Sequence, residues 1–192
     1  MKPLLSFSAA VDAICAFVGK AVSWLILATV LVSAGNAIVR KAFDYSSNGW
    51  LELQWYLFGA VFLLAAAYTL QRNEHIRIDI LSSRLSKRTR DWIDLVCFVV
   101  MLLPFTALIV YEAVPNVLTS FRQQEMSMNA GGLIIWPAKA LILAAFVLLF
   151  LQCLSEIIKR IGVLNDAIAD PTPEMHTHPA NEDMILEDKP GA

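Results

Sequence analysis

Long stretches without charged residues dominate this sequence. Between Lys20 and Arg40 lie the nineteen uncharged residues Ala21 to Val39. As an α-helix, such a stretch is about 28 Å long, close to the hydrocarbon thickness of a bilayer, about 30 Å. Apolar residues make up 57% of the chain, against about 45–50% in a typical soluble domain. A membrane must therefore form part of the solvent of this protein.

Three further apolar stretches predict membrane-spanning helices, and the four expected spans cover about residues 21–39, 50–70, 92–114 and 133–161. The second span begins among Trp50, Trp55 and Tyr56, residue types that are typical of the membrane–water interface. The third contains Pro104, which is expected to kink the helix and free a carbonyl group. We predict an all-α integral membrane protein with one membrane domain, residues 1–162.

Two segments beside these spans have apolar residues at helical spacing and predict amphipathic helices at the lipid interface. The first precedes Ala21 and includes Val11 and Cys15 on its apolar stripe. The second covers about residues 79–91, and its interfacial residues are Leu81, Arg84, Leu85, Lys87, Arg88 and Trp92. Residues 163–192 hold four prolines and seven acidic residues against one lysine, which predicts a disordered acidic tail.

Positively charged residues predict which side of the membrane each connection occupies. Four spans place both termini and the central connection on one side. That side carries Lys2, Arg72, Arg77, Arg84, Lys87, Arg88, Arg90, Lys159 and Arg160, and the opposite side carries Arg40, Lys41 and Arg122. Because short loops rich in Lys and Arg stay in the cytoplasm, we expect both termini to be cytoplasmic.

Charged residues of the expected spans lie near the span ends. A charge at the bilayer centre is unfavourable by about 2.5–3.5 kcal/mol and would mark a functional site, but we expect none here. Glu52 and Gln54 have two open interpretations, either a polar contact with a partner helix or an ordinary helix end in contact with water. The same alternatives apply to Asp94 and Glu112, whereas Lys139 can extend its ammonium group to the interface.

Histidine and cysteine positions argue against catalytic or metal chemistry. His75, His176 and His178 lie outside the expected spans, which excludes a haem held between facing helices. The three cysteines lack a CxxC spacing, and no nucleophile triad, phosphate loop or zinc-protease motif is present. We predict no enzymatic activity, no cofactor and no metal. Nucleic acid is an unlikely class of partner for a chain of net charge -2 with an acidic tail.

Three stretches carry a resemblance to a known family. The first combines residues 47–56 (SNGWLELQWY) with residues 73–81 (NEHIRIDIL), the second is the basic segment around 79–91, and the third is residues 125–139 (EMSMNAGGLIIWPAK). Together they resemble the small membrane subunit of tripartite ATP-independent periplasmic (TRAP) transporters, the DctQ type. The resemblance covers roughly residues 21–161.

The resemblance implies a subunit of a bacterial inner-membrane transporter that has no substrate site of its own. It would scaffold the large, M-type permease subunit during ion-coupled uptake of an organic acid or related solute. A periplasmic solute-binding protein and membrane lipids would be its other partners. Within the matching motifs, Asp79 is expected to cap the amphipathic helix beside Arg77, and Trp136 and Lys139 to mark the entry of the last span.

An autonomous four-span carrier that couples transport to protons as a homo-oligomer is the alternative. Such a carrier needs an acidic residue inside the membrane, and Glu52 is the candidate for that role. Its shallow position in the second span argues against this alternative.

Overall fold

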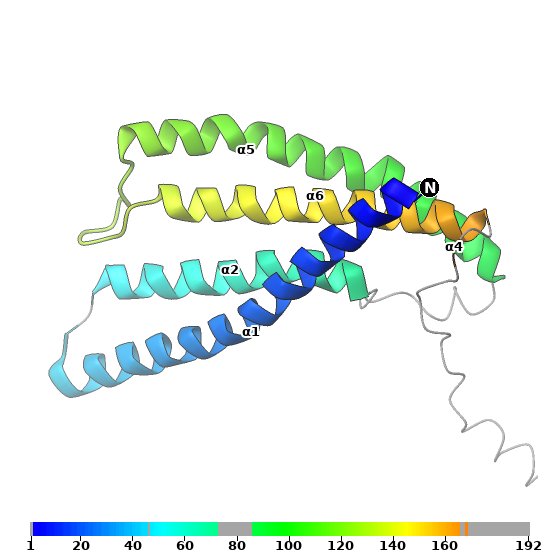
Figure 1. Ribbon diagram of the computed structural model, residues 1–192. Helices are drawn as coiled ribbons and strands as arrows, with labels where there is room; N and C mark the ends of the chain where they lie inside the picture. Colours follow the sequence, from blue (N-terminus) through cyan, green and yellow to red (C-terminus); the bar gives the residue numbers. More distant parts are fainter. Residues whose placement is uncertain (1, 46, 73–85, 166–167, 169–192) are drawn as a thin grey trace, which may run out of the picture.

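The computed structural model describes residues 2–45, 47–72, 86–165 and 168, and these residues are almost entirely helical (Figure 1). Its elements are α1 (Lys2–Phe43), α2 (Asn48–Arg72), α4 (Lys87–Cys97), the π-helical segment η1 (Phe98–Leu102), α5 (Leu103–Gln123) and α6 (Trp136–Leu164). Because α4, η1 and α5 follow one another without a break, they form one long helix. Within the described residues, four helices are thus long and apolar enough to cross a membrane, which confirms the predicted fold class.

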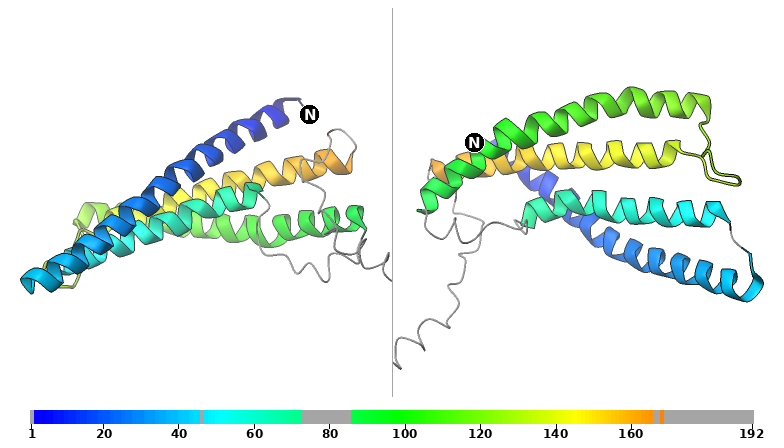
Figure 2. Two further views of the ribbon diagram at one scale, coloured as in Figure 1. Left: turned by 90° about the horizontal axis from the view of Figure 1, so that it is seen from below. Right: turned by 180° about the vertical axis from the view of Figure 1, so that it is seen from behind.

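The four long helices lie side by side and alternate in direction along the chain, so that the neighbours α2 and α6 run parallel (Figure 1). One end of the bundle carries the N-terminus, the end of α2 at residue 72, the start of α4 at residue 87 and the end of α6 at residue 164. We call it the terminal end. The opposite end, with the connections at residues 44–47 and 124–135, is the hairpin end. At the hairpin end the helices follow the order α1, α2, α6, α5 (Figure 1). Toward the terminal end, α1 crosses over and packs on α6 as well as on α2 (Figure 2).

This arrangement encloses only a small core. Val11, Cys15 and Ala67 are buried where α1, α2 and α6 meet, and partly buried leucines of α6 pack around them, namely Leu148, Leu149 and Leu151. Elsewhere large apolar side chains point outward, and Trp24 and Phe62 are 75% and 72% exposed. Surfaces of this kind require lipid or another protein to cover them.

The N-terminal segment differs from the expectation of a separate interfacial helix. It continues without a break into the first span, so that α1 has 42 residues and a length of about 63 Å at 1.5 Å per residue. Val11 and Cys15 are 4% and 0% exposed, because these two residues pack on other helices of the same chain instead of contacting lipid.

Pro104 lies directly after the π-helical segment. A proline cannot donate a backbone hydrogen bond, and a π-helical turn is one of the local adjustments that accommodate it. The backbone N–H of Leu103 bonds to the carbonyl oxygen of Phe98, which also accepts from the thiol of Cys153 on α6 at 3.7 Å. The π-helical turn is a distortion of the expected kind, but the carbonyl that Cys153 contacts is that of Phe98 and not that of Val100, four residues before the proline.

The third spanning helix begins inside the segment that we predicted to be interfacial. Ser86 is its N-cap and accepts a hydrogen bond from the N–H of Thr89 at 3.3 Å, so Lys87 and Arg88 belong to the first turn of α4. The rest of that prediction lies outside the described residues, as do Arg77, Asp79, Leu81, Arg84 and Leu85, and most of the expected tail.

Candidate functional site

Glu52 forms the centre of a polar cluster at the hairpin end. Its side chain lies in the first turns of α2 and is 5% exposed. The carboxylate accepts hydrogen bonds from the N–H of Leu133 at 2.6 Å, from the side-chain amide of Asn129 at 2.9 Å and from the hydroxyl of Ser127. All three donors belong to the connection between α5 and α6. The contact that the structure shows is with a connection of the same chain, and the expected contact with a partner helix stays a prediction.

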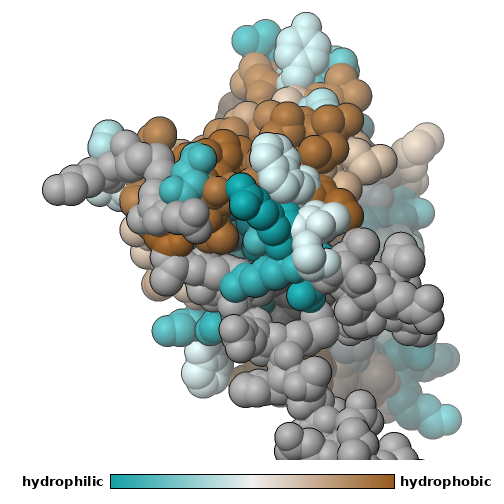
Figure 3. Space-filling view, turned by 90° about the vertical axis from the view of Figure 1, so that its right-hand side faces the viewer, coloured by the Kyte–Doolittle hydropathy of each residue, from teal (hydrophilic) through white to brown (hydrophobic). Residues whose placement is uncertain are grey.

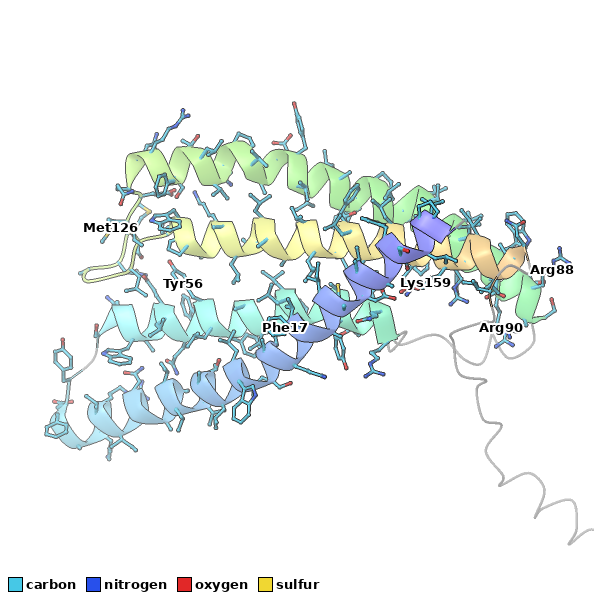
Figure 4. All side chains as sticks on the ribbon, in the orientation of Figure 1. Phe17, Tyr56, Arg88, Arg90, Met126 and Lys159 are labelled. Atoms are coloured by element: carbon cyan, nitrogen blue, oxygen red, sulfur yellow. The ribbon has the colours of Figure 1, made fainter. Side chains whose placement is uncertain are left out.

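The connection between α5 and α6, which Glu52 contacts, is a compact turn whose two sides run antiparallel. Met126 and Ile134 form an isolated antiparallel bridge, and Gly131 adopts a φ of 71°, a conformation that favours glycine. The start of α2 contacts this turn twice more, because the Asn48 amide donates to the carbonyl of Ala130 at 2.9 Å and the Tyr56 hydroxyl to that of Ile134 at 3.5 Å. Figure 4 shows Tyr56 and Met126 together at this end.

Gly132 leaves no room for a side chain in this cluster. A Cβ atom at this position would lie 2.5 Å from Cβ of Ser127 and 2.8 Å from Oε1 of Glu52. We expect Gly132→Ala to destabilise the protein by about 1–3 kcal/mol, as overpacking does elsewhere, measured as thermal unfolding in detergent. Gly59→Ala is the matched control, because a Cβ there meets nothing within 4 Å. Equal melting temperatures of the two variants would show that the turn does not pack in this way.

Two further contacts fix the entry of α6. The Lys139 ammonium bonds to the Glu125 carboxylate at 2.6 Å, and the ring of Trp136 meets that of Phe121 edge to face with centroids 5.2 Å apart. The Lys139 ammonium group holds the pKa of Glu125 below its ordinary value of 4.5. Trp136 and Lys139 therefore bind the connection and α5 to α6.

The lowered pKa of Glu125 predicts a pH dependence of stability. Because the folded state has the lower pKa, the ion pair contributes fully above pH 4.5 and its contribution is lost as the pH falls through the pKa of the folded state. We expect the melting temperature to fall more in wild type than in Glu125→Gln when the pH is lowered from neutral. Parallel curves for the two proteins would contradict this role, although the effect is small for an exposed pair.

Gln54 makes a second contact near the hairpin end. Its side-chain oxygen accepts a hydrogen bond from the Asn36 amide of α1 at 3.3 Å. Like Glu52, this residue contacts another helix of its own chain. The pair ties α1 to α2 at a level where α1 otherwise exposes apolar residues.

A second polar cluster joins α1 to α6 near the terminal end. The Asp12 carboxylate accepts hydrogen bonds from the Gln152 amide at 2.9 Å and the Ser155 hydroxyl at 3.1 Å, and pairs with the Lys159 ammonium at 3.2 Å. Glu156 contacts the same Lys159 and Gln152. Gln152 and Ser155 are fully buried, and Figure 4 shows Lys159 near the crossing of α1 and α6. The cluster thus fixes this crossing.

Arg160 forms a third polar cluster with α4. Its guanidinium bonds to the Asp91 carboxylate at 2.6 Å and lies 3.3 Å from that of Asp94, and both Arg160 and Asp91 are largely buried. Asp94 therefore pairs within the chain. Figure 3 looks onto this end and shows hydrophilic residues next to a hydrophobic surface. Trp92 is 53% exposed, and Arg88 and Arg90 lie at the outer limit of the terminal end (Figure 4).

Asp12, Glu156 and Arg160 were not among the candidates from sequence. One signal could have found Glu156, because Gln152, Glu156 and Lys159 recur at i, i+4 and i+7 on a helix that is otherwise apolar. Such a polar stripe at the end of a span predicts a buried face.

The helix that contains Glu112 is longer than the expected span. It does not end near residue 114 but continues to Gln123. Glu112 therefore lies about 13 Å along the axis from Phe121, whose ring contacts that of Trp136. Arg122, rather than Glu112, is the charged residue that precedes the connection, and the expectation that charged residues lie near the span ends stays a prediction.

Comparison with known protein families decides the class of protein. Residues 29–162 match the family model described as tripartite ATP-independent periplasmic transporters, DctQ component. The chain belongs to the DctQ family. No curated protein and no solved structure matches the chain. The DctQ match covers α1 from residue 29 onward and reaches the other three long helices, and it includes Glu52, its turn and the Arg160 cluster.

As a DctQ-family protein, the chain is a component of a TRAP transporter. Components of this family work with a large permease and a periplasmic binding protein. The family is one of transport components and not of enzymes. Among the described residues, no group of three or more His, Cys, Asp or Glu side chains could hold a metal ion. The polar clusters of this DctQ component therefore connect helices, and each pairs acidic groups with donors from the same chain.

Proposed function

We propose that this chain is the small permease subunit that scaffolds the large permease subunit of a TRAP transporter. The observation that carries the proposal is the open arrangement of the helices. Four spanning helices surround only a small core, and the outward faces of α1, α2 and α5 expose large apolar side chains. A helical layer of this kind widens an assembly without enclosing a path for a solute.

The polar clusters support a stationary role. Glu52, Asp12 and Arg160 each fix one helix or connection to another through several donors. A carrier that alternates between two states would need such contacts to break in every cycle. We infer that this subunit has no substrate site, and that the large subunit binds an organic acid or related solute, delivered by the periplasmic binding protein and coupled to an ion.

The same clusters argue against an autonomous proton-coupled carrier. Glu52 is the acid on which that alternative depends, and its two carboxylate oxygens already accept three hydrogen bonds from the connection between α5 and α6. A group that exchanges protons with a solute path must be accessible from that path. The hydrogen bonds of Glu52 instead hold the connection between α5 and α6.

The orientation follows from the positive charges. The terminal end carries Arg72, Lys87, Arg88, Arg90, Lys159 and Arg160 in the described part of the chain. Lys87 and Arg88 line a hollow of about 260 Å³ beside the end of α6, where anionic lipid headgroups fit the charge. We therefore place the terminal end and both termini at the cytoplasmic face of the bacterial inner membrane.

Purification from the native host in mild detergent tests the proposal. Mass spectrometry of the tagged chain should recover a larger polytopic permease in stoichiometric amount, and deletion of the small subunit should abolish solute uptake while the binding protein is still produced. Recovery of a homo-oligomer alone, with transport in liposomes by that oligomer, would refute the scaffold role.

A further inference from the structure

A stripe of polar residues runs along the outer surface of α5. Its members are Glu112, Asn116, Thr119 and Gln123, which we call the α5 polar stripe. The intervals of four, three and four residues keep them on one side of a helix. All four are exposed, whereas Thr106 and Ser120, which are 0% and 1% exposed, mark the buried side of α5. The stripe therefore lies on a surface that other helices of the chain leave open.

The stripe extends from the hairpin end into the interior of a spanning helix. Glu112 lies about 13 Å along the helix axis from Phe121 and about 27 Å from Asp94, inside a helix that is long and apolar enough to cross a membrane. Intramembrane acids are rare and almost always face protein or a water-filled cavity. A carboxylate on an open helix surface at this depth therefore indicates a covered surface in the assembled protein.

The polar groups of the stripe make no polar contact with the residues that the structure describes. Elsewhere the hydroxyls of Thr29, Thr69 and Thr106 donate to carbonyls one turn earlier in their own helices. Within the part of the chain that the structure describes, no hydrogen bond or ion pair engages Glu112, Asn116 or Thr119. The stripe therefore offers its full hydrogen-bonding capacity to another molecule.

Pro115 adds an acceptor beside Glu112. Because proline has no N–H, the carbonyl of Tyr111, four residues earlier, loses its regular helical donor. In membranes, neighbouring helices commonly satisfy a carbonyl freed in this way. The Glu112 carboxylate and the Tyr111 carbonyl thus present two acceptors at one depth, which together call for a donor from outside.

We propose that the α5 polar stripe is the surface on which a transmembrane helix of the large permease subunit packs, with a cationic or hydrogen-bond-donating side chain at the level of Glu112. The inference rests on the proposed scaffold function and names the face that fulfils it. Lipid tails offer no donors. A second copy of this chain across a two-fold axis would bring the same surface into the interface, and the stripe carries a carboxylate but no cationic side chain.

Photo-crosslinking tests which molecule covers the stripe. A benzophenone amino acid replaces Asn116 or Thr119 in the full chain, with Glu112 intact, and the complex is irradiated in native membranes. Val114 and Leu118 are the controls, because each is exposed at a similar depth but lies roughly 200° around the helix from Glu112 and Asn116, respectively. We expect crosslinks to the large subunit from the stripe positions and not from the controls.

Substitution of Glu112 tests the chemistry. Glu112→Leu should lower the recovery of the large subunit several-fold and Glu112→Lys should abolish it, whereas Glu112→Gln, which keeps an acceptor, retains most of it. Leu118→Ala, at the exposed control position on the far side of α5, should leave recovery unchanged. The yield and helicity of the small subunit alone should not change, because Glu112 makes no hydrogen bond or ion pair within the described residues.

The possible failures are distinguishable. Three results would overturn the stripe as the docking surface while the scaffold function stands. They are crosslinks to a second copy of this chain, crosslinks to the large subunit from the control positions only, and full recovery with Glu112→Leu and Glu112→Lys. Absence of the large subunit from purified wild-type protein would overturn both.

Discussion

Replacing Arg160 with methionine is expected to destabilise the protein by about 3–5 kcal/mol, the usual effect of removing one partner of a buried ion pair. The guanidinium bonds to Asp91 at 2.6 Å and lies 3.3 Å from Asp94. The side chains of Arg160 and Asp91 are 7% and 8% exposed. Without the cation, two carboxylates would remain close together between α4 and α6, one of them away from water. Denaturant unfolding in mixed micelles measures the loss.

A second substitution separates the ion pair from general damage to the helix end. The double substitution Arg160→Met and Asp91→Leu removes both charges of the shorter of the two ion pairs of Arg160. It should recover much of the stability, because an apolar pair can replace a buried ion pair. Arg40→Met, at an exposed site near the hairpin end, is the control and should change little. If Arg160→Met unfolded at the wild-type denaturant concentration, the cluster would not hold α4 against α6.

The number and class of the helices could be predicted from the sequence because each depends on local composition. Ala21 to Val39 can cross a bilayer whatever its neighbours are, and the entry of the last span carries Trp136 and Pro137 in its first turn. The residue at which a helix ends depends less on local composition. Residues 113–121 are uncharged, and only the position of Phe121 against Trp136 shows that this stretch continues the span.

The partners of charged residues could not be predicted, since they depend on how helices cross. Glu52 and Asp94 were both recognised as polar residues near span ends, but their partners at Leu133 and Arg160 are distant in sequence. Asp12 was missed because its helix seemed from composition to lie at the lipid surface. The crossing of α1 over α6 places it against the polar stripe of α6.

Asp12→Leu should release the N-terminal half of α1 from α6. Asp12 accepts hydrogen bonds from Gln152 and Ser155, and it shares the Lys159 ammonium with Glu156. Leucine removes this acceptor from a fully buried amide and hydroxyl, but the Gln152 amide keeps its bond to Glu156 and the Ser155 hydroxyl keeps its contacts with Ser8. We therefore expect a total loss of about 1–3 kcal/mol. The Lys159 and Glu156 pair remains, so the loss should be confined to the crossing of α1 over α6.

Hydrogen exchange locates this effect within the molecule. In Asp12→Leu, backbone amides around Val11 and Cys15 should exchange faster than in wild type, whereas amides of α5, which does not touch Asp12, should be unchanged. Asp12→Asn keeps one acceptor oxygen and should give a smaller increase at the same amides. Unchanged exchange in α1 would mean that the apolar contacts of Val11, Cys15 and Ala67 alone hold the crossing. A uniform increase in every helix would mean that the cluster stabilises the whole fold rather than this contact.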